Sequence, residues 1–151
     1  MKKPRNEMTI TFLSRSANEA FSRSAAAAFF SQLDPTVEEL ADIKTAVSEA
    51  VTNCIVHAYR DTLGKIRMTA RIYDGGEIYI QVKDSGCGIP DVKQAMEPLF
   101  TTCETGERAG LGFAVMQSFM DKVSVRSAPG KGTAVTLRKT LSQRSGDEAG
   151  E

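Results

Sequence analysis

The sequence has little of what disulfide-rich, metal-binding and nucleic-acid-binding proteins depend on. It contains one histidine and three cysteines, Cys54, Cys87 and Cys103, which are widely spaced and form no Cys-x-x-Cys pair. This pattern fits neither a disulfide framework nor a zinc site, and reduced thiols predict a cytoplasmic protein. Basic and acidic side chains number 19 each, so the net charge is zero. A protein that binds nucleic acid directly would be expected to carry a basic excess.

Long apolar runs are also missing. No segment is long enough to span a bilayer, and the basic residues Lys2, Lys3 and Arg5 are not followed by the apolar stretch of a signal peptide. We therefore expect no membrane contact. The length of 151 residues suits one domain with its own core. We assign residues 1–141 to that domain and the polar residues 142–151 to a disordered tail.

Hydrophobic periodicity predicts the order strand, two helices, two strands, loop, helix and two strands. Alternating residues predict strands at 8–13, 65–73, 77–83, 123–125 and 133–137, with a hairpin turn at Asp74-Gly75-Gly76. This order favours an α+β fold. We expect a two-layer sandwich, in which helices cover one face of a mixed, mostly antiparallel sheet.

Capping signals set the expected helix starts. Ser16 and Glu19 have the spacing of a capping box, and Asp34 followed by Pro35 predicts an N-cap and first helical residue. The second helix should run from residue 36 to about 59, because its apolar residues fall on one stripe. A short helix after Pro90, a mobile loop over residues 97–108 and a helix over 111–120 complete the prediction.

Two glycine-rich segments indicate a ligand-binding site. Asp84-Ser85-Gly86-Cys87-Gly88 ends a predicted strand, and Gly110-Leu111-Gly112 opens a predicted helix. Glycine allows the backbone to approach a ligand closely, and amides at a helix start can bind phosphate oxygens. The pattern therefore indicates a nucleotide site, although a simple turn after a strand has the same residues.

Glu49, Asn53 and His57 recur every four residues on the second predicted helix, away from its apolar stripe. A solvated polar face would explain this spacing. Asn53 could also offer a neutral oxygen to magnesium, and Glu49 could accept a proton from an attacking hydroxyl. His57 alone forms neither a metal cluster nor a catalytic triad, so we expect it to be structural.

Four segments occur in an order typical of one ATP-binding superfamily. They resemble the N, G1, G2 and G3 boxes of gyrase, heat-shock-90 chaperones, histidine kinases and mismatch-repair ATPases, the GHKL superfamily with the Bergerat fold. Within it, the chain is most similar to small anti-sigma factors that are also serine kinases, above all the anti-sigma F factors of spore-forming bacilli. The four boxes are Glu49-Ala50-Val51-Thr52-Asn53, Asp84-Ser85-Gly86-Cys87-Gly88, Arg108-Ala109-Gly110-Leu111-Gly112 and Gly130-Lys131-Gly132-Thr133. Further similarity lies in Arg5-Asn6-Glu7-Met8, Gln32-Leu33-Asp34-Pro35 and Pro98-Leu99-Phe100-Thr101-Thr102.

The resemblance implies a site for ATP and Mg²⁺. Asn53 would hold Mg²⁺, Glu49 would be the general base for a substrate serine, and Asp84 would accept a hydrogen bond from the adenine amino group. Arg108 would lie in a lid over residues 100–110 and stabilise the γ-phosphate, where histidine kinases commonly have glycine. Other nucleotide contacts are implied for Gly86, Gly88, Thr101, Gly110, Leu111, Gly112 and Thr133.

The resemblance also implies partners. They are a sporulation sigma factor of the F type and an anti-anti-sigma factor that is the phosphorylation substrate. A homodimer would form through the strand at 8–13 and the helix after it. Arg23 on the first predicted helix is the implied partner-binding residue for both proteins, although a solvated arginine on an amphipathic helix is the commoner arrangement.

Other functions stay open at this point. The ATP-binding half of a histidine kinase would need a phosphoacceptor histidine on a separate helix pair, and the single histidine lies inside the predicted site. Such kinases also commonly have asparagine where Glu49 stands. A binding module that ATP switches without catalysis remains an alternative, as does an anti-sigma kinase for a stress-response sigma factor.

Overall fold

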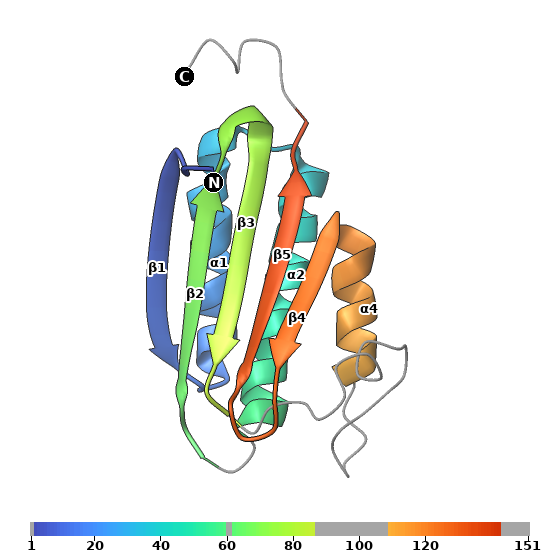
Figure 1. The fold of residues 1–151 in the computed structure, drawn as a ribbon. Helices are drawn as coiled ribbons and strands as arrows, with labels where there is room; N and C mark the ends of the chain where they lie inside the picture. Colours follow the sequence, from blue (N-terminus) through green and yellow to red (C-terminus); the bar gives the residue numbers. More distant parts are fainter. Residues whose placement is uncertain (1, 60–61, 87–108, 143–151) are drawn as a thin grey trace.

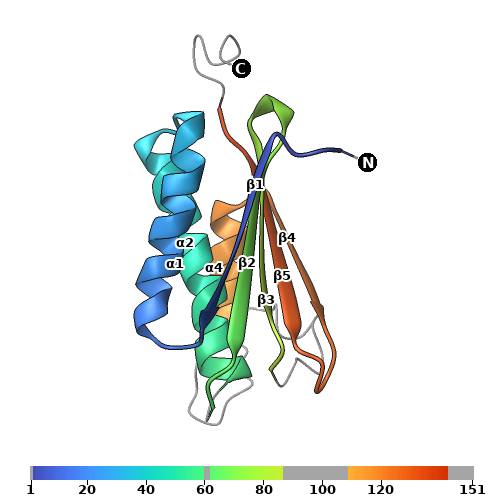
Figure 2. The same cartoon turned by 90° about the vertical axis from the view of Figure 1, so that its left-hand side faces the viewer.

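One antiparallel sheet forms the body of the protein in the computed structural model, which describes residues 2–59, 62–86 and 109–142. The strand order is β1-β2-β3-β5-β4, and each pairing among these strands is antiparallel (Figure 1). The helices lie together on one face of the sheet (Figure 2). The predicted two-layer α+β sandwich is therefore confirmed. The elements are β1 Asn6–Leu13, α1 Ala17–Phe30, α2 Val37–Asn53, β2 Lys65–Ile72, β3 Glu77–Asp84, α4 Ala109–Phe119, β4 Lys122–Ser127 and β5 Thr133–Thr140.

The core fills the space between the sheet and the helices. Alternate residues of the central strands are fully buried on the helix side, among them Ile66, Met68, Ile80 and Leu137. The α2 helix presents its predicted apolar stripe to them, and each fully buried aliphatic side chain is worth about 1.5–3 kcal/mol. The buried members of that helix are Ile43, Ala46, Val47, Ala50 and Val51. The other face of the sheet carries exposed and half-buried side chains, with Tyr79 as a buried exception.

The predicted capping box at the start of α1 is wrong. Ser16 is the N-cap, but its backbone is helical (φ −59°, ψ −31°) and its side chain makes no capping hydrogen bond. A capping side chain can accept from the free N–H groups of the first turn only when the backbone of the N-cap residue is extended. The Glu19 carboxylate instead accepts hydrogen bonds from Arg23 and from Ser48 on α2.

The predicted N-cap of the second helix, Asp34, is also wrong, and so is Pro35 as its first residue. Asp34 adopts a left-handed conformation (φ 52°, ψ 55°) and ends the 3₁₀ turn Ser31–Leu33, a geometry that aspartate tolerates better than most residues. Thr36 is the N-cap because its backbone is extended, and it forms a full capping box with Glu39. The Thr-x-x-Glu spacing was present in the sequence, but the neighbouring Asp-Pro pair was the stronger signal.

The remaining predicted elements divide into two groups. The hairpin turn at Asp74-Gly75-Gly76 is confirmed between β2 and β3, and both of its glycines have positive φ. The short helix expected after Pro90, the loop at 97–108 and most of the tail lie outside the described residues. None of the helices in the described ranges has the length and apolar character that crossing a bilayer requires.

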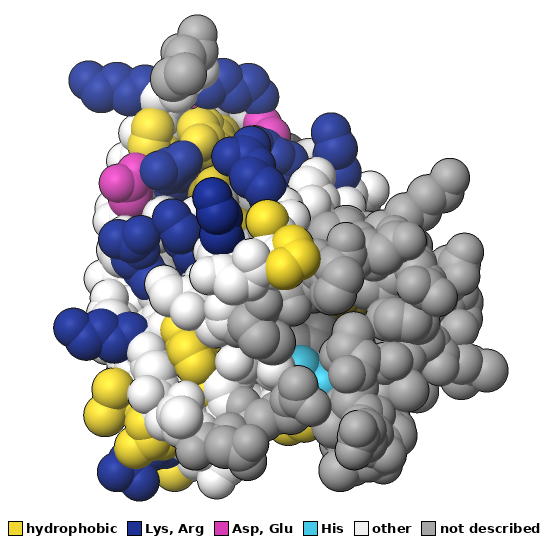
Figure 3. Space-filling model, turned by 60° about the horizontal axis from the view of Figure 1, so that its bottom comes forward, with side chains coloured by type: hydrophobic (Ala, Val, Ile, Leu, Met, Phe, Trp, Pro, Cys, Tyr) yellow, Lys and Arg dark blue, Asp and Glu magenta, His cyan; other side chains and the backbone are white. Residues whose placement is uncertain are grey.

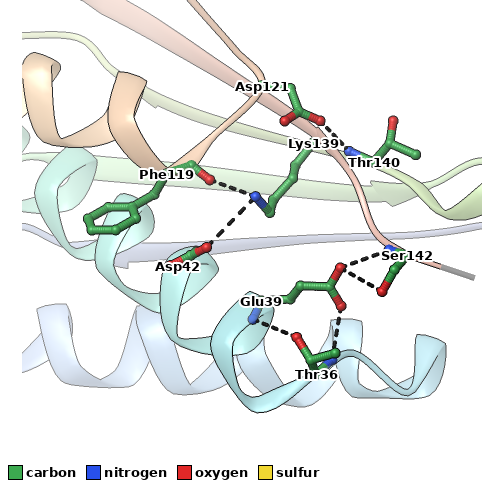
Figure 4. A network of polar contacts seen from close by, with 8 residues as sticks. All are labelled: Thr36, Glu39, Asp42, Phe119, Asp121, Lys139, Thr140 and Ser142. Carbon is green, nitrogen blue, oxygen red and sulfur yellow. Dashed lines mark hydrogen bonds and ion pairs between the residues drawn. The ribbon is translucent and has the colours of Figure 1, made fainter.

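A network of hydrogen bonds connects the start of α2 to the chain just after β5 (Figure 4). One Glu39 oxygen accepts from the Thr36 N–H at 2.9 Å, and the other accepts from the N–H and hydroxyl of Ser142 at 2.7 and 3.0 Å. Nearby, Lys139 donates to the Phe119 carbonyl at 2.8 Å. Burial alone would raise the pKa of Glu39, but the hydrogen bonds from Ser142 and Thr36 outweigh it and lower that pKa below 4.5.

Glu39→Ala tests this network through stability. The variant should lose about 1–2 kcal/mol of unfolding free energy at pH 7, because it removes half of a capping box and the Ser142 contacts. A carboxylate with a lowered pKa stabilises the fold above its unfolded pKa and loses this effect as pH falls through the folded pKa. The difference between variant and wild type should therefore shrink below about pH 4.

Urea unfolding at pH 7 and pH 3 measures the effect, with Glu38→Ala as the matched control. Glu38 lies in the same first turn and shares the helix dipole, so this control should change stability much less. Equal losses for the two variants at both pH values would show that the network contributes nothing beyond first-turn charge.

Candidate functional site

The predicted site residues gather where β3 ends and β5 begins, beside the last turns of α2. Asp84 is the last residue of β3, is 5% exposed and pairs with Thr133, the first residue of β5. The Gly86 N–H donates to Asp84 Oδ1 at 2.8 Å, and the Cys54 thiol donates to Oδ2 at 3.3 Å. Both carboxylate oxygens thus have protein partners, and the side chain is held in one orientation.

Burial shifts the pKa values of both Asp84 and Cys54. It raises the pKa of Asp84, and hydrogen bonds from Gly86, Cys54 and Thr133 act in the opposite direction. Burial also raises the pKa of Cys54 well above its usual range, and the neighbouring charge of Asp84 adds to the effect. Cys54 therefore stays a thiol and can donate to the carboxylate. No motif in the sequence signals this hydrogen bond, because Cys54 and Asp84 are brought together only by the fold.

Two glycines allow the backbone to close around Asp84. A Cβ atom on Gly132 would lie 2.2 Å from the Asp84 carbonyl oxygen, and this glycine has φ +82°. A Cβ atom on Gly86 would lie 2.4 Å from the Ala58 carbonyl oxygen. Such distances exclude any side chain, so glycine is required at both positions. The β4–β5 turn and the end of the α2 segment can therefore contact the Asp84 loop directly.

The second helix ends in a π-helical turn that was not predicted. After Asn53 the chain continues as a π-helix over Cys54–Ala58, and the Tyr59 N–H donates to the Cys54 carbonyl at 3.1 Å. Single π turns inside helices are frequent at functional sites. Tyr59 follows this turn, and its hydroxyl accepts from the Ser85 N–H and donates to the Lys65 carbonyl at 2.9 Å. Neither feature is indicated by a pattern in the sequence.

Glu49 and Asn53 face the start of α4. A Cβ atom built on Gly112 would lie 3.1 Å from Glu49 Oε1 and 3.4 Å from Asn53 Oδ1. Both side chains are partly buried, so they do not form a fully solvated polar face. The Asn53 amide nitrogen is buried without a hydrogen-bond partner in the described part of the chain. Burying such a group costs about 1–3 kcal/mol, and natural sites with this feature often serve a ligand.

These residues fit a magnesium-bound polyphosphate. An amide oxygen and a carboxylate are ligands or second-shell partners that hydrated Mg²⁺ accepts, and the glycine leaves room for phosphate oxygens beside them. Among the described residues, no group of three or more His, Cys, Asp or Glu side chains could hold a metal by itself. A cation here would therefore depend on the phosphates for most of its oxygen ligands.

Hydroxyl groups line the β5 side of the site. The Ser127 hydroxyl donates to the Gly132 carbonyl at 2.9 Å and lies 2.8 Å from the Thr133 hydroxyl. Because a hydroxyl has one proton to donate, Thr133 is then the donor in the second contact. This pair fixes Thr133 next to Asp84. Ser127 was not among the predicted site residues, because its place is set by the β4–β5 register and not by a motif.

The structure brings together some of the predicted site residues and leaves others untested. Glu49, Asn53, Asp84, Gly86, Gly112 and Thr133 converge at this end of the molecule, and Gly110 and Leu111 lie in the first turn of α4. Gly88, Thr101 and Arg108 lie outside the described residues. Arg23 lies apart from the site on α1, where its side chain is 39% exposed and pairs with Glu19 at 3.1 Å.

Comparison with known proteins extends these observations. A family model described as a histidine kinase-like ATPase domain matches residues 12–139. The anti-sigma F factor of Caldanaerobacter subterraneus subsp. tengcongensis is 59% identical over 136 residues, which cover 90% of this chain and 94% of that protein.

Solved structures share the fold. The RsbU and RsbW domains of Rv1364c from Mycobacterium tuberculosis match 94% of this chain and 34% of theirs, with a TM-score of 0.68 and 22% identity. Full-length ShkA in complex with AMPPNP matches 72% of this chain and 23% of its own, with a TM-score of 0.55 and 20% identity. Given the family match and the identity to curated relatives, the chain belongs to the anti-sigma F factors of the histidine kinase-like ATPase family.

Proposed function

We propose that this protein is a cytoplasmic anti-sigma factor and a Mg²⁺-ATP-dependent serine kinase. It binds and inhibits a sporulation sigma factor of the F type, and it phosphorylates a serine of the anti-anti-sigma protein that opposes it. The name shared by its relatives supports the sigma-factor partner. The AMPPNP complex of a protein with the same fold supports ATP as the nucleotide.

The convergence of Glu49 and Asn53 on Gly112 carries the proposal. Asn53 would hold the cation through its amide oxygen, and the nitrogen of the same amide, which has no hydrogen-bond partner among the described residues, would contact a phosphate. The bound Mg²⁺-ATP supplies the phosphoryl group and neutralises charge that develops on it. The free N–H groups of the first turn of α4, that of Gly110 among them, would face the phosphates, and Gly112 would leave room beside them.

Asp84 and Thr133 would hold the adenine end. The carboxylate accepts from Gly86 and Cys54, but each oxygen has a second lone pair for the adenine amino group. Gly86, Gly88, Thr101 and Leu111 would complete the pocket. Arg108 would add its charge at the γ-phosphate from the lid.

Glu49 would act as the general base. Its carboxylate lies one helical turn before Asn53, so a serine hydroxyl that approaches the terminal phosphate would come within its reach. Glu49 would accept the hydroxyl proton as the oxygen attacks, and general-base help of this kind is worth about 10²–10⁴-fold in rate.

Two substitutions on α2 separate nucleotide binding from catalysis. Asn53→Ala should abolish measurable Mg²⁺-ATP binding, because it removes the amide oxygen that would hold the cation. Glu49→Ala should keep ATP affinity within a few-fold and lower phosphoryl transfer at least 100-fold. Calorimetry with ATP and a radiolabel assay with the anti-anti-sigma protein measure the two effects.

The same assay decides between the alternatives. Transfer by Glu49→Ala within a few-fold of wild type would remove Glu49 from the mechanism. A wild-type protein that binds ATP and the partner but never phosphorylates it would be an ATP-switched binding module. Binding to a stress-response sigma factor in preference to the F type would change the assigned partner and leave the kinase in place.

Arg23 is our candidate for the partner-binding residue. The adjacent turns of α1 contribute Ala26 and Phe30 to the core, where both are fully buried, so neither is available to a partner. Arg23 itself remains partly exposed, and Glu19 holds it in place while also accepting a hydrogen bond from Ser48. Its planar guanidinium can bind a partner carboxylate with two hydrogen bonds.

We further propose a homodimer, with β1 and α1 as its interface.

Arg23→Ala should weaken binding of both the sigma factor and the anti-anti-sigma protein by more than tenfold, with ATP affinity unchanged. Glu19→Gln is the matched control, because it removes the partner of Arg23 and leaves the guanidinium in place. This control should stay within about threefold of wild type. If the two variants lose affinity equally, Arg23 serves only to stabilise α1, and the shared-site proposal fails.

A further inference from the structure

The face of the sheet away from the helices is basic, although the chain has no net charge. On β2, Arg67 is exposed between the fully buried Ile66 and Met68, so it points away from the core. By the same alternation, Lys83 and Arg126 point to this face from β3 and β4. Figure 3 shows Lys and Arg side chains gathered on one side of the molecule, with few acidic ones among them.

Three of these cations form one row across the sheet, here called the basic row: Arg67, Lys83 and Arg126. Arg67 is directly opposite Lys83, which is opposite Ala134, which in turn is opposite Arg126. All three are exposed, and none makes an ion pair or hydrogen bond in the described structure. Like charges directly opposite on neighbouring strands destabilise a sheet, so the fold alone does not favour this arrangement.

A second row on the same face shows how the sheet neutralises cations elsewhere. Arg71 and Arg138 lie on either side of the Tyr79 ring, each 4.8 Å from its centre. Arg71 pairs with Glu7 at 3.1 Å, and Arg138 pairs with Glu77 at 3.7 Å. The basic row has neither an acid nor an aromatic ring, and it is therefore the part of the face that remains open to an external anion.

The basic row lies at the same end of the sheet as the candidate site, on the opposite face. Lys83 directly precedes Asp84, and Ala134 directly follows Thr133. A ligand on the basic row would therefore be separated from the nucleotide by the thickness of the sheet. It would leave the helix layer uncovered, so it could bind at the same time as a partner that uses α1.

The other side chains of this face favour a polypeptide over a nucleic acid. Single-stranded nucleic acids need aromatic rings on which bases stack, and Tyr79 is 8% exposed between two guanidinium groups. Beside the basic row lies a neutral row that includes Thr69, Gln81 and Thr136. These groups can hydrogen-bond the backbone of an extended chain.

We propose that the basic row is a docking surface for an Asp/Glu-rich segment of a protein partner. The carboxylates of such a segment would supply the negative charge that the row lacks, and its backbone would lie along the neutral row. The association would be salt-dependent, because the contacts are exposed. This surface is independent of the nucleotide site and of the proposed partner contact at Arg23.

Fluorescence anisotropy with a labelled twelve-residue peptide of alternating Asp and Glu tests the proposal. Wild type should bind the peptide at 50 mM NaCl and much more weakly at 300 mM. The variant Arg67→Gln/Lys83→Gln/Arg126→Gln should bind about tenfold more weakly than wild type at low salt. The control Lys3→Gln/Arg15→Gln/Lys44→Gln removes the same charge elsewhere and should bind within about twofold of wild type.

The thermal midpoint and ATP affinity of the triple variant show whether it is folded. The thermal midpoint should equal or exceed that of wild type, since the changes relieve like-charge repulsion, and ATP affinity should be unchanged, since the basic row lies on the opposite face of the sheet. If the triple variant does not fold, Lys83→Gln alone should still weaken peptide binding measurably. Equal weakening by the control, or tighter binding of a twelve-nucleotide oligo-dT than of the peptide by wild type, would overturn the proposal.

Discussion

The arrangement of the candidate functional site depends on the buried carboxylate of Asp84. A carboxylate removed from water must recover its lost hydration through hydrogen bonds. Here they come from three places in the chain: the thiol of Cys54 after α2, the N–H of Gly86 in the following loop and the backbone of Thr133 on β5. Satisfying one side chain therefore fixes a helix, a loop and a strand relative to one another.

Close backbone contact is the second constraint, and it explains where the glycines lie. Gly132 brings the β4–β5 turn against the Asp84 backbone, and Gly86 brings the loop against the end of the π-helix. Gly112 plays a different part, because without a side chain it leaves room beside the oxygens of Glu49 and Asn53 at the start of α4. The first two close the structure around Asp84, while the third leaves the space that the proposed phosphates would occupy.

Patterns that depend on periodicity could be predicted from the sequence, and those that depend on local conformation could not. Alternation gave the strands and the turn at Asp74-Gly75-Gly76, and the four boxes gave Glu49, Asn53 and Asp84 as neighbours. The helical conformation of Ser16 and the left-handed conformation of Asp34 overruled both predicted caps. Neither follows from residue type, because each depends on how the flanking elements pack. The π-helix and the hydrogen bond from Cys54 likewise depend on tertiary contacts, and the opposition of Arg67 and Lys83 becomes visible only once the strand register is known.

The proposed recognition of adenine by Asp84 is tested most directly by a calorimetric comparison of ATP with inosine triphosphate. Inosine carries an oxygen where adenine carries its amino group, so it would face the carboxylate with an acceptor. Wild type should bind ATP at least tenfold more tightly than inosine triphosphate, since a lost hydrogen bond to a charged group costs about 1.5–3 kcal/mol. Asp84→Asn should lose that preference while remaining folded. Equal affinity of wild type for the two nucleotides, or an unchanged preference in Asp84→Asn, would contradict the account.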